Sequence, residues 1–148
     1  MVTYKIIVEN RDYDNVCYYN SLTLNKIELD LEFSPRSHKM FNQDIFKIEG
    51  NKIKILHSMT REMSVIPGVI NCSSNKTFGK YKNKFLYKCI PDDRRMPIFL
   101  IPYTDKNITF SKKKINKYIL FKFDNWESKH PKGIITNTLG NVDNLDIF

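Results

Sequence analysis

Apolar and polar residues alternate along the first third of the chain, as they do in half-buried β-strands. Residues 4–8 form a short apolar run, and residues 10–15, rich in Asn and Asp, predict a turn. The alternation is longest from 22 to 33, which predicts one extended strand with a buried and an exposed face. The buried face would hold Ile27, Leu29, Leu31 and Phe33, and the exposed face Lys26, Glu28, Asp30 and Glu32. Because the exposed face is mostly acidic, we expect it to be a poor place to bind phosphate.

A β-hairpin is predicted over residues 44–56, because apolar and charged residues alternate on both sides of a Gly-Asn turn. Residues 57–63 lack periodicity and are interpreted as a linker. We therefore divide the chain into a smaller or partial β-barrel module over residues 1–60 and a second domain over residues 61–148.

The second domain contains five strand candidates, at 65–70, 85–90, 98–101, 118–126 and 133–140. A short, lysine-rich helix is predicted over 111–117, between the third and fourth strands. Strand, short helix, strand, long loop and strand in this order indicate an OB-fold, a five-stranded barrel that often holds single-stranded nucleic acid. The predicted fold class is therefore all-β: a cold-shock-like OB barrel, preceded by a partial module of the same kind.

The charge balance favours an anionic partner. Lys and Arg number 24 against 16 Asp and Glu, which gives a net charge of +8. Nucleic acid is a better fit than a membrane surface, because the sequence shows no amphipathic basic helix and no apolar run of membrane-spanning length. The alternative is that the positive charge serves only solubility.

The sequence shows no catalytic or metal-binding constellation. Neither the cysteines nor the histidines have the spacing of a metal site or a disulfide framework (Cys17, Cys72, Cys89; His38, His57, His130). Asp92 and Asp93 are adjacent carboxylates, but consecutive side chains point apart, and Arg94 and Arg95 would neutralise them. We expect no catalytic residue, metal or cofactor in this chain, and reduced thiols typical of a nuclear or cytoplasmic protein.

Two loops interleave cations with aromatic rings, a combination that can clasp a nucleic-acid strand through phosphates and bases. In an OB barrel they would be the first and last inter-strand loops, which converge at one end of the binding face. The predicted RNA-binding residues are Lys76, Phe78, Lys80, Tyr81, Lys82, Arg94, Arg95, Trp126, Lys129 and Lys132. For Trp126 a core position is the alternative, since a lone Trp at a strand end often packs inside.

Several motifs resemble one enzyme family. Residues 93–97, Asp-Arg-Arg-Met-Pro, are similar to the Asp-Arg-Arg-Ile-Pro element in the second cold-shock domain of ribonuclease II-type 3′–5′ exoribonucleases. The eukaryotic subgroup that forms the catalytic subunit of the RNA exosome is the most similar. Residues 124–126, 128–133 and 139–140 resemble the family's Asp-x-Trp, Tyr-Pro-x-Gly and Leu-Gly pattern, and 67–70 its first strand.

The resemblance covers residues 64–148 and, more weakly, 38–49. It implies a single-stranded RNA-binding region that guides RNA to a catalytic domain absent from this chain, where aspartates hold magnesium. It also implies that this catalytic domain and the exosome core subunits are partners. The alternative is a protein-docking OB module without RNA affinity, suggested by apolar Ile98 and Leu100 where the family alternates basic and apolar residues. A free-standing nuclease is a third, less favoured hypothesis.

Overall fold

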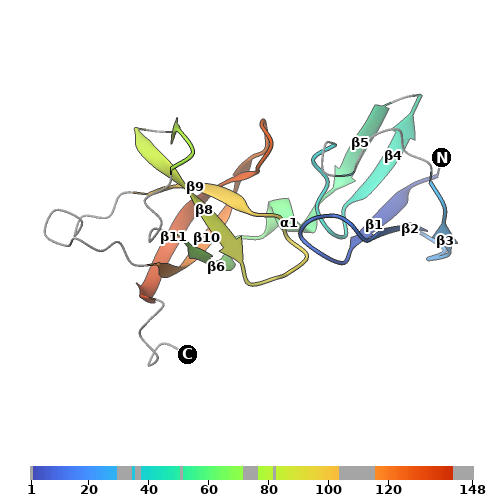
Figure 1. Cartoon of the computed structure of the whole chain (residues 1–148). Coiled ribbons are helices and arrows are strands. Elements are labelled where there is room, and N and C mark those ends of the chain that lie inside the picture. Colours follow the sequence, from blue (N-terminus) through green and yellow to red (C-terminus); the bar gives the residue numbers. More distant parts are fainter. Residues whose placement is uncertain are drawn as a thin grey trace, which may run out of the picture. The chain divides into compact units, whose positions relative to one another are not determined.

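The computed structural model describes residues 2–29, 35, 38–50, 52–71, 77–81, 83–103 and 116–141. The chain forms two compact units, which consist of Met1–Glu62 with Arg94–Pro97 and of Met63–Asp93 with Ile98–Phe148. Strands make up nearly all of the regular structure in both units (Figure 1). The predicted all-β fold class is confirmed.

The first unit contains one antiparallel sheet of five strands in the order β3-β2-β1-β4-β5. The strands are β1 (Tyr4–Val8), β2 (Val16–Asn20), β3 (Lys26–Ile27), β4 (Ile45–Glu49) and β5 (Lys52–His57). Ile6, Val8 and Phe46 are fully buried, and the Phe46 ring meets the edge of Tyr18 at a centroid distance of 6.0 Å. These contacts define the core face of the sheet.

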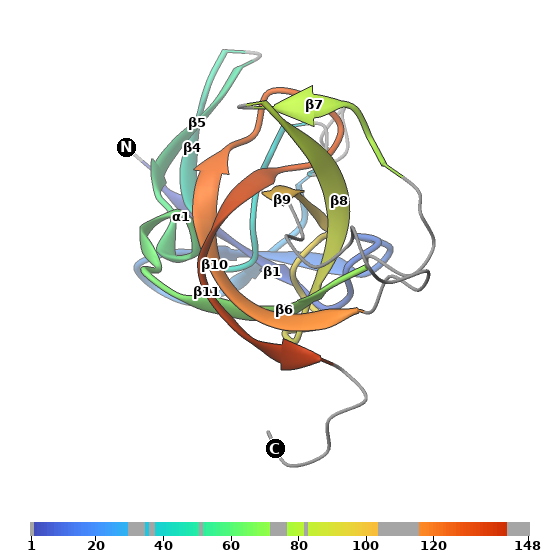
Figure 2. The ribbon, with the colours of Figure 1, turned by 90° about the vertical axis from the view of Figure 1, so that its left-hand side faces the viewer.

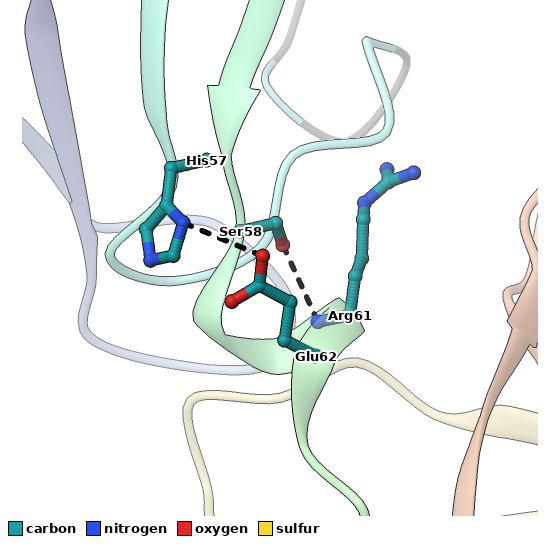
Figure 3. A network of polar contacts seen from close by, with 4 residues as sticks. All are labelled: His57, Ser58, Arg61 and Glu62. Carbon is teal, nitrogen blue, oxygen red and sulfur yellow. Dashed lines mark hydrogen bonds and ion pairs between the residues drawn. The ribbon is translucent and has the colours of Figure 1, made fainter.

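A short helix, α1 (Met59–Glu62), follows β5 where the sequence predicted only a linker. Ser58 caps it, because its Oγ accepts a hydrogen bond from the Arg61 N–H at 3.4 Å (Figure 3). The His57 Nδ1 lies 3.6 Å from a carboxylate oxygen of Glu62, across the first turn. The polar residues around 58–62 thus form a local turn of helix rather than an irregular connection.

The second unit is a closed barrel (Figure 2). Its strands are β6 (Ile66–Ile70), β7 (Lys80–Tyr81), β8 (Lys84–Pro91), β9 (Phe99–Tyr103), β10 (Lys117–Asn125) and β11 (Lys132–Asn141). The pairings run β6-β8-β9-β11-β10 and back to β6, while β7 extends β8 as a short hairpin. All are antiparallel except β9–β11, which pair in parallel at Leu100 and Lys132. This closed circle is the OB-fold expected from the sequence.

The same strand order relates the two units. With β7 left out and the other strands of the second barrel numbered 1 to 5 in chain order, the circle of paired strands reads 1-2-3-5-4 and returns to 1. The five strands of the first sheet, numbered in the same way, follow the order 3-2-1-4-5. In the part of the chain that the structure describes, the first sheet therefore has the strand order of this circle, but its third and fifth strands do not pair. The expected partial OB-like module fits this arrangement.

Close packing inside the second barrel demands a glycine. The Phe99 and Phe121 rings meet edge-on at a centroid distance of 4.9 Å, and both side chains are fully buried. A Cβ on Gly133 would lie 2.8 Å from Cδ2 of Phe121 and 2.9 Å from the Lys122 carbonyl oxygen. Only a residue without a side chain lets β11 pass this close to the ring.

The predicted long strand over 22–33 is wrong in part. Residues 21–23 form a turn, in which Oδ1 of Asn20 accepts hydrogen bonds from the Leu22 and Thr23 N–H groups at 2.9 and 3.0 Å. The strand shrinks to Lys26–Ile27, and residues 30–34 lie outside the described part. The sequence analysis also missed β2, whose residues Val-Cys-Tyr-Tyr-Asn show no alternation of apolar and charged side chains. Of the predicted helix over 111–117, only 116 and 117 are described, and Lys117 begins β10.

Candidate nucleic-acid interface

Tyr81 joins the two loops that the sequence analysis singled out. Its hydroxyl donates a hydrogen bond to Oδ2 of Asp124 at 2.9 Å and accepts one from Nδ2 of Asn125 at 3.1 Å. The Lys132 Nζ lies 4.7 Å from the centroid of the Tyr81 ring. Asp124 and Asn125 end β10 and Lys132 begins β11, so the first and last loops of the barrel meet, as predicted.

A short hairpin presents Tyr81 to these partners. Lys80 and Tyr81 pair with Phe85 and Lys84. Before the hairpin, backbone hydrogen bonds of 2.9 Å join Phe78 N to Leu86 O and Leu86 N to Gly79 O. Gly79 has a φ of 97°, a conformation that glycine adopts without strain. Figure 2 shows β7 beside the loop between β10 and β11, at one end of the barrel.

The environment of Tyr81 disfavours ionisation of its hydroxyl. The pKa of Tyr81 is raised, chiefly by the hydrogen bond to Asp124, because ionisation would place two negative charges side by side. The hydroxyl therefore remains a hydrogen-bond donor. Its hydrogen bond to Asp124 holds the ring in place, and the Lys132 cation lies against that ring. Asp124 balances part of the positive charge here and orders the loop.

Four lysines lie over aromatic rings among the described residues of this unit. They are Lys80 over Phe85 at 4.9 Å, Lys88 over Phe78 at 5.0 Å, Lys117 over Tyr103 at 5.8 Å and Lys132 over Tyr81 at 4.7 Å. The side chain of Phe85 is 47% exposed, so its ring keeps a surface open to a ligand. We call the end of the barrel that carries Lys80, Tyr81, Phe85, Lys129 and Lys132 the cationic mouth. By register, Lys80 and Phe85 lie on one face of the β7–β8 hairpin and Tyr81 on the other. A base can stack on such rings while the amino groups meet phosphates.

The structure describes eight of the ten predicted residues. Lys80 and Lys129 are exposed, and Phe78, Tyr81 and Lys132 are half-buried. Arg94 and Arg95 are exposed on the loop between β8 and β9, within a segment grouped with the first unit. Lys76 and Lys82 lie outside the described residues.

The structure corrects the predicted RNA-binding role of Trp126. Its side chain is only 6% exposed, which leaves no open ring face for a base. The core alternative is therefore the right one for this residue.

Conversely, sequence analysis missed Phe85 and Lys88, because it assigned residues 85–90 to a strand and considered ligands only in loops. The hairpin places Lys80 beside Phe85, and that pairing was the missing signal.

The protein-docking alternative loses its support. Exposure of Ile98 and Leu100 would have supported it, but Leu100 is 6% exposed and Ile98 is half-buried. The Leu100 N–H also donates a hydrogen bond of 2.9 Å to the carbonyl oxygen of Pro131, which ties β9 to the loop before β11. This pair of residues therefore offers no exposed apolar surface to a partner.

Two further observations concern metal ions and membranes in the described part of the chain. There, no three His, Cys, Asp or Glu side chains come together in a way that could hold a metal ion. None of the described helices is long and apolar enough to cross a bilayer.

Fold and site together define a class: an OB barrel with a cationic, ring-bearing mouth formed by its first and last loops. Residues 86–147 match the family model of the Dis3-like cold-shock domain 2. The resemblance to the second cold-shock domain of ribonuclease II-type exoribonucleases is thus confirmed for the part of the chain from β8 onwards. No curated protein matches the chain.

Two solved structures resemble the whole chain in outline. They are the apo form of Mycoplasma genitalium RNase R and the same enzyme in complex with ribose-methylated single-stranded RNA. Each is 14% identical over 98% of this chain, with a TM-score of 0.48. The chain corresponds to 22% of the length of these enzymes.

Proposed function

We propose that the second unit binds single-stranded RNA without sequence preference at the cationic mouth. The observation that supports this most is the contact of Tyr81 with Asp124, Asn125 and Lys132. It brings the two loops to one place, where a single strand can reach cations and rings from both. The match to a cold-shock domain family supports the same function.

The mouth suits an unpaired strand. The exposed amino groups of Lys80 and Lys129 can meet successive phosphates, and this interaction carries no sequence information. The open ring of Phe85 offers a stacking platform, which tolerates every base because each has a π-face. A base within a duplex is already stacked on its neighbours, so single strands are the expected ligand.

The test is a salt series of binding titrations with a fluorescent oligouridylate. If four or five phosphates are neutralised, the log–log slope of affinity against salt should be about −3 to −4, at roughly −0.7 per phosphate. A slope near zero at measurable affinity would contradict the proposal.

Matched variants locate the contacts. Lys129→Gln and Lys132→Gln should each flatten the slope by about 0.7, because each removes one phosphate contact. Lys122→Gln, an exposed lysine in the middle of β10 and outside the mouth, serves as control and should leave the slope unchanged. If all three variants flattened the slope by the same amount, binding would depend only on the overall charge of the chain and not on these contacts.

We further propose that the parent protein is an exosome-type 3′–5′ exoribonuclease. In this proposal the chain guides RNA to a catalytic domain that holds magnesium through aspartates, in the nucleus or cytoplasm, with exosome core subunits as partners. The Dis3-like family match of residues 86–147 supports it. The chain itself should bind labelled RNA equally well in magnesium and in EDTA and leave it intact, and metal-dependent degradation would overturn this division of labour.

A further inference from the structure

The outer face of the second barrel carries a group of apolar side chains that has no role in the function proposed above. Val69 on β6 pairs with Ile90 on β8 and with Tyr118 on β10. Pro67, two residues earlier on β6, pairs with Leu120 on β10. Directly opposite residues on antiparallel strands point to the same side of a sheet. These five side chains therefore form two adjacent rows across three neighbouring strands, and we call them the outer patch.

The outer patch faces away from the barrel core. The residues that alternate with it along the strands are buried, among them Ile66, Ile70 and Ile119. Pro67 and Ile90 are exposed, Ile90 to 42%, and the other three members of the patch are half-buried. Contiguous apolar patches on a protein surface mark interaction sites. The outer patch therefore calls for a cover.

The sequence of β6 indicates the same. Residues 65–70 read Val-Ile-Pro-Gly-Val-Ile, without a polar residue on either face. A short, continuous apolar run of this kind is typical of a strand that is buried on both sides. The barrel core covers the inner side, but Val65, just before β6, is 42% exposed like Ile90. The described residues thus leave open a side of the strand that its pattern indicates is covered.

The chain leaves the barrel beside the outer patch. Tyr118 pairs with Gly140, so the first row of the patch continues to β11. This strand ends one residue later, at Asn141, and residues 142–148 lie outside the described part. These seven residues span about 23 Å when extended, at about 3.3 Å per residue. The three steps from β11 to β8 cover about 14 Å, at about 4.8 Å each. The segment is therefore long enough to cross the whole patch.

The segment also has the chemistry that the patch requires. Residues 142–148 read Val-Asp-Asn-Leu-Asp-Ile-Phe, so most of them are apolar and two are acidic. Lys88 on β8 and Lys122 on β10 flank the patch on its own face, and Asp92 follows the end of β8. The positive excess of this rim suits two aspartates. The match to the cold-shock domain family runs to residue 147 and so includes nearly all of the segment.

We propose that residues 142–148 fold back across the outer face of the barrel and cover the outer patch. Their apolar side chains pack on Ile90, Val69 and Tyr118, and their aspartates face the lysines of the rim. The segment thereby buries the second side of β6 and keeps the patch from other partners. A partner protein and a second copy of this chain are the alternative occupants, which the test separates.

The test is an NMR experiment on the full isotope-labelled chain without RNA. The heteronuclear NOEs of the amides of 142–148 should be as high as those of β11, because they report order on the picosecond-to-nanosecond timescale. Cross-peaks should join the methyl groups of Leu145 and Ile147 to the outer patch. Ile90→Ser and Leu145→Ser should each weaken these cross-peaks and lower the NOEs of the segment. Leu56→Ser, at a leucine on β5 that is 44% exposed, is the matched control and should change nothing.

The outcomes decide between the occupants. Low NOEs along 142–148 in the unsubstituted chain overturn the proposal and leave the outer patch open to a partner protein. Order that increases with protein concentration overturns it too, because it indicates docking on a second copy. Order that survives both Ile90→Ser and Leu145→Ser shows that the segment packs elsewhere, which also contradicts the proposal. Because no RNA is present, none of these results bears on the function proposed for the cationic mouth.

Discussion

At the scale of single residues, the site depends on partners that are distant in sequence. Tyr81 bonds with Asp124 and Asn125, more than forty positions further along the chain. Sequence analysis identified Tyr81 and Lys132 because cations and rings clustered in two loops. It could not identify Asp124 or Phe85, because their roles arise only once the barrel closes and the β7–β8 hairpin forms.

Trp126 should report its buried position. As the chain's single tryptophan, it dominates the fluorescence. We expect a blue-shifted emission that is poorly quenched by acrylamide and unchanged by saturating oligouridylate, because the side chain is 6% exposed. Trp126→Ala should cost roughly 3–5 kcal/mol of unfolding free energy, measured by urea titration. Strong quenching by RNA with unaltered stability would restore the stacking role.

Asp44 in the first unit should make stability depend on pH. Its carboxyl is fully buried, and burial outweighs the hydrogen bonds from Ser58 and Phe41 and raises the pKa of Asp44 to about 6. A raised pKa stabilises the fold below the unfolded value of 3.8, and this contribution is lost as pH rises through 6. Between pH 5 and 7 the loss is about 1 kcal/mol.

Urea unfolding at both pH values checks this expectation, with Asp44→Asn as the matched variant. In the protein, Oδ2 of Asp44 accepts a hydrogen bond of 2.9 Å from the Phe41 N–H. Asparagine keeps an acceptor oxygen for this N–H, but its side chain does not titrate. The variant should lose the pH dependence of the first unit. A chain more stable at pH 7 than at pH 5 would contradict the assignment.

At the scale of elements, strands with a clear apolar pattern were predicted, and those without one were missed or misplaced. The hairpin of β4 and β5 and the strands β6, β8, β9, β10 and β11 fall where the pattern indicated. The strand β2 was missed, and β3 was drawn too long, because side-chain hydrogen bonds from Asn20 fold the next residues into a turn. Such local competition between side chain and sheet does not appear in an alternation count.

Gly133 tests how tightly β11 must pass the core. Gly133→Ala would press a methyl group against the ring of Phe121 and the Lys122 carbonyl oxygen, and should destabilise the second unit by about 1–3 kcal/mol in urea unfolding. Thr136→Ala, at an exposed position of the same strand, is the control and should cost well under 1 kcal/mol. If both variants lowered the free energy of unfolding equally, the close approach of Gly133 to the Phe121 ring would not be needed for stability.

At the scale of the whole molecule, the strand order of each unit explains why the binding residues gather. A circle of strands brings the loop after the first strand and the loop between the last two to one end of the barrel. Sequence predicted this circle because helix, loop and strand lengths followed the OB pattern. For the first unit the sequence predicted only a partial module of the same kind, and the strand pairings of its described part show where the circle is left open.

The central claim is that the cationic mouth receives the RNA strand. The most direct measurement is an NMR titration of the isotope-labelled chain with oligouridylate, which maps the affected backbone amides. We predict the largest shifts at Tyr81, Phe85, Asn125, Lys129 and Lys132, and none at β6. Saturable binding that leaves those five amides unmoved would contradict the account.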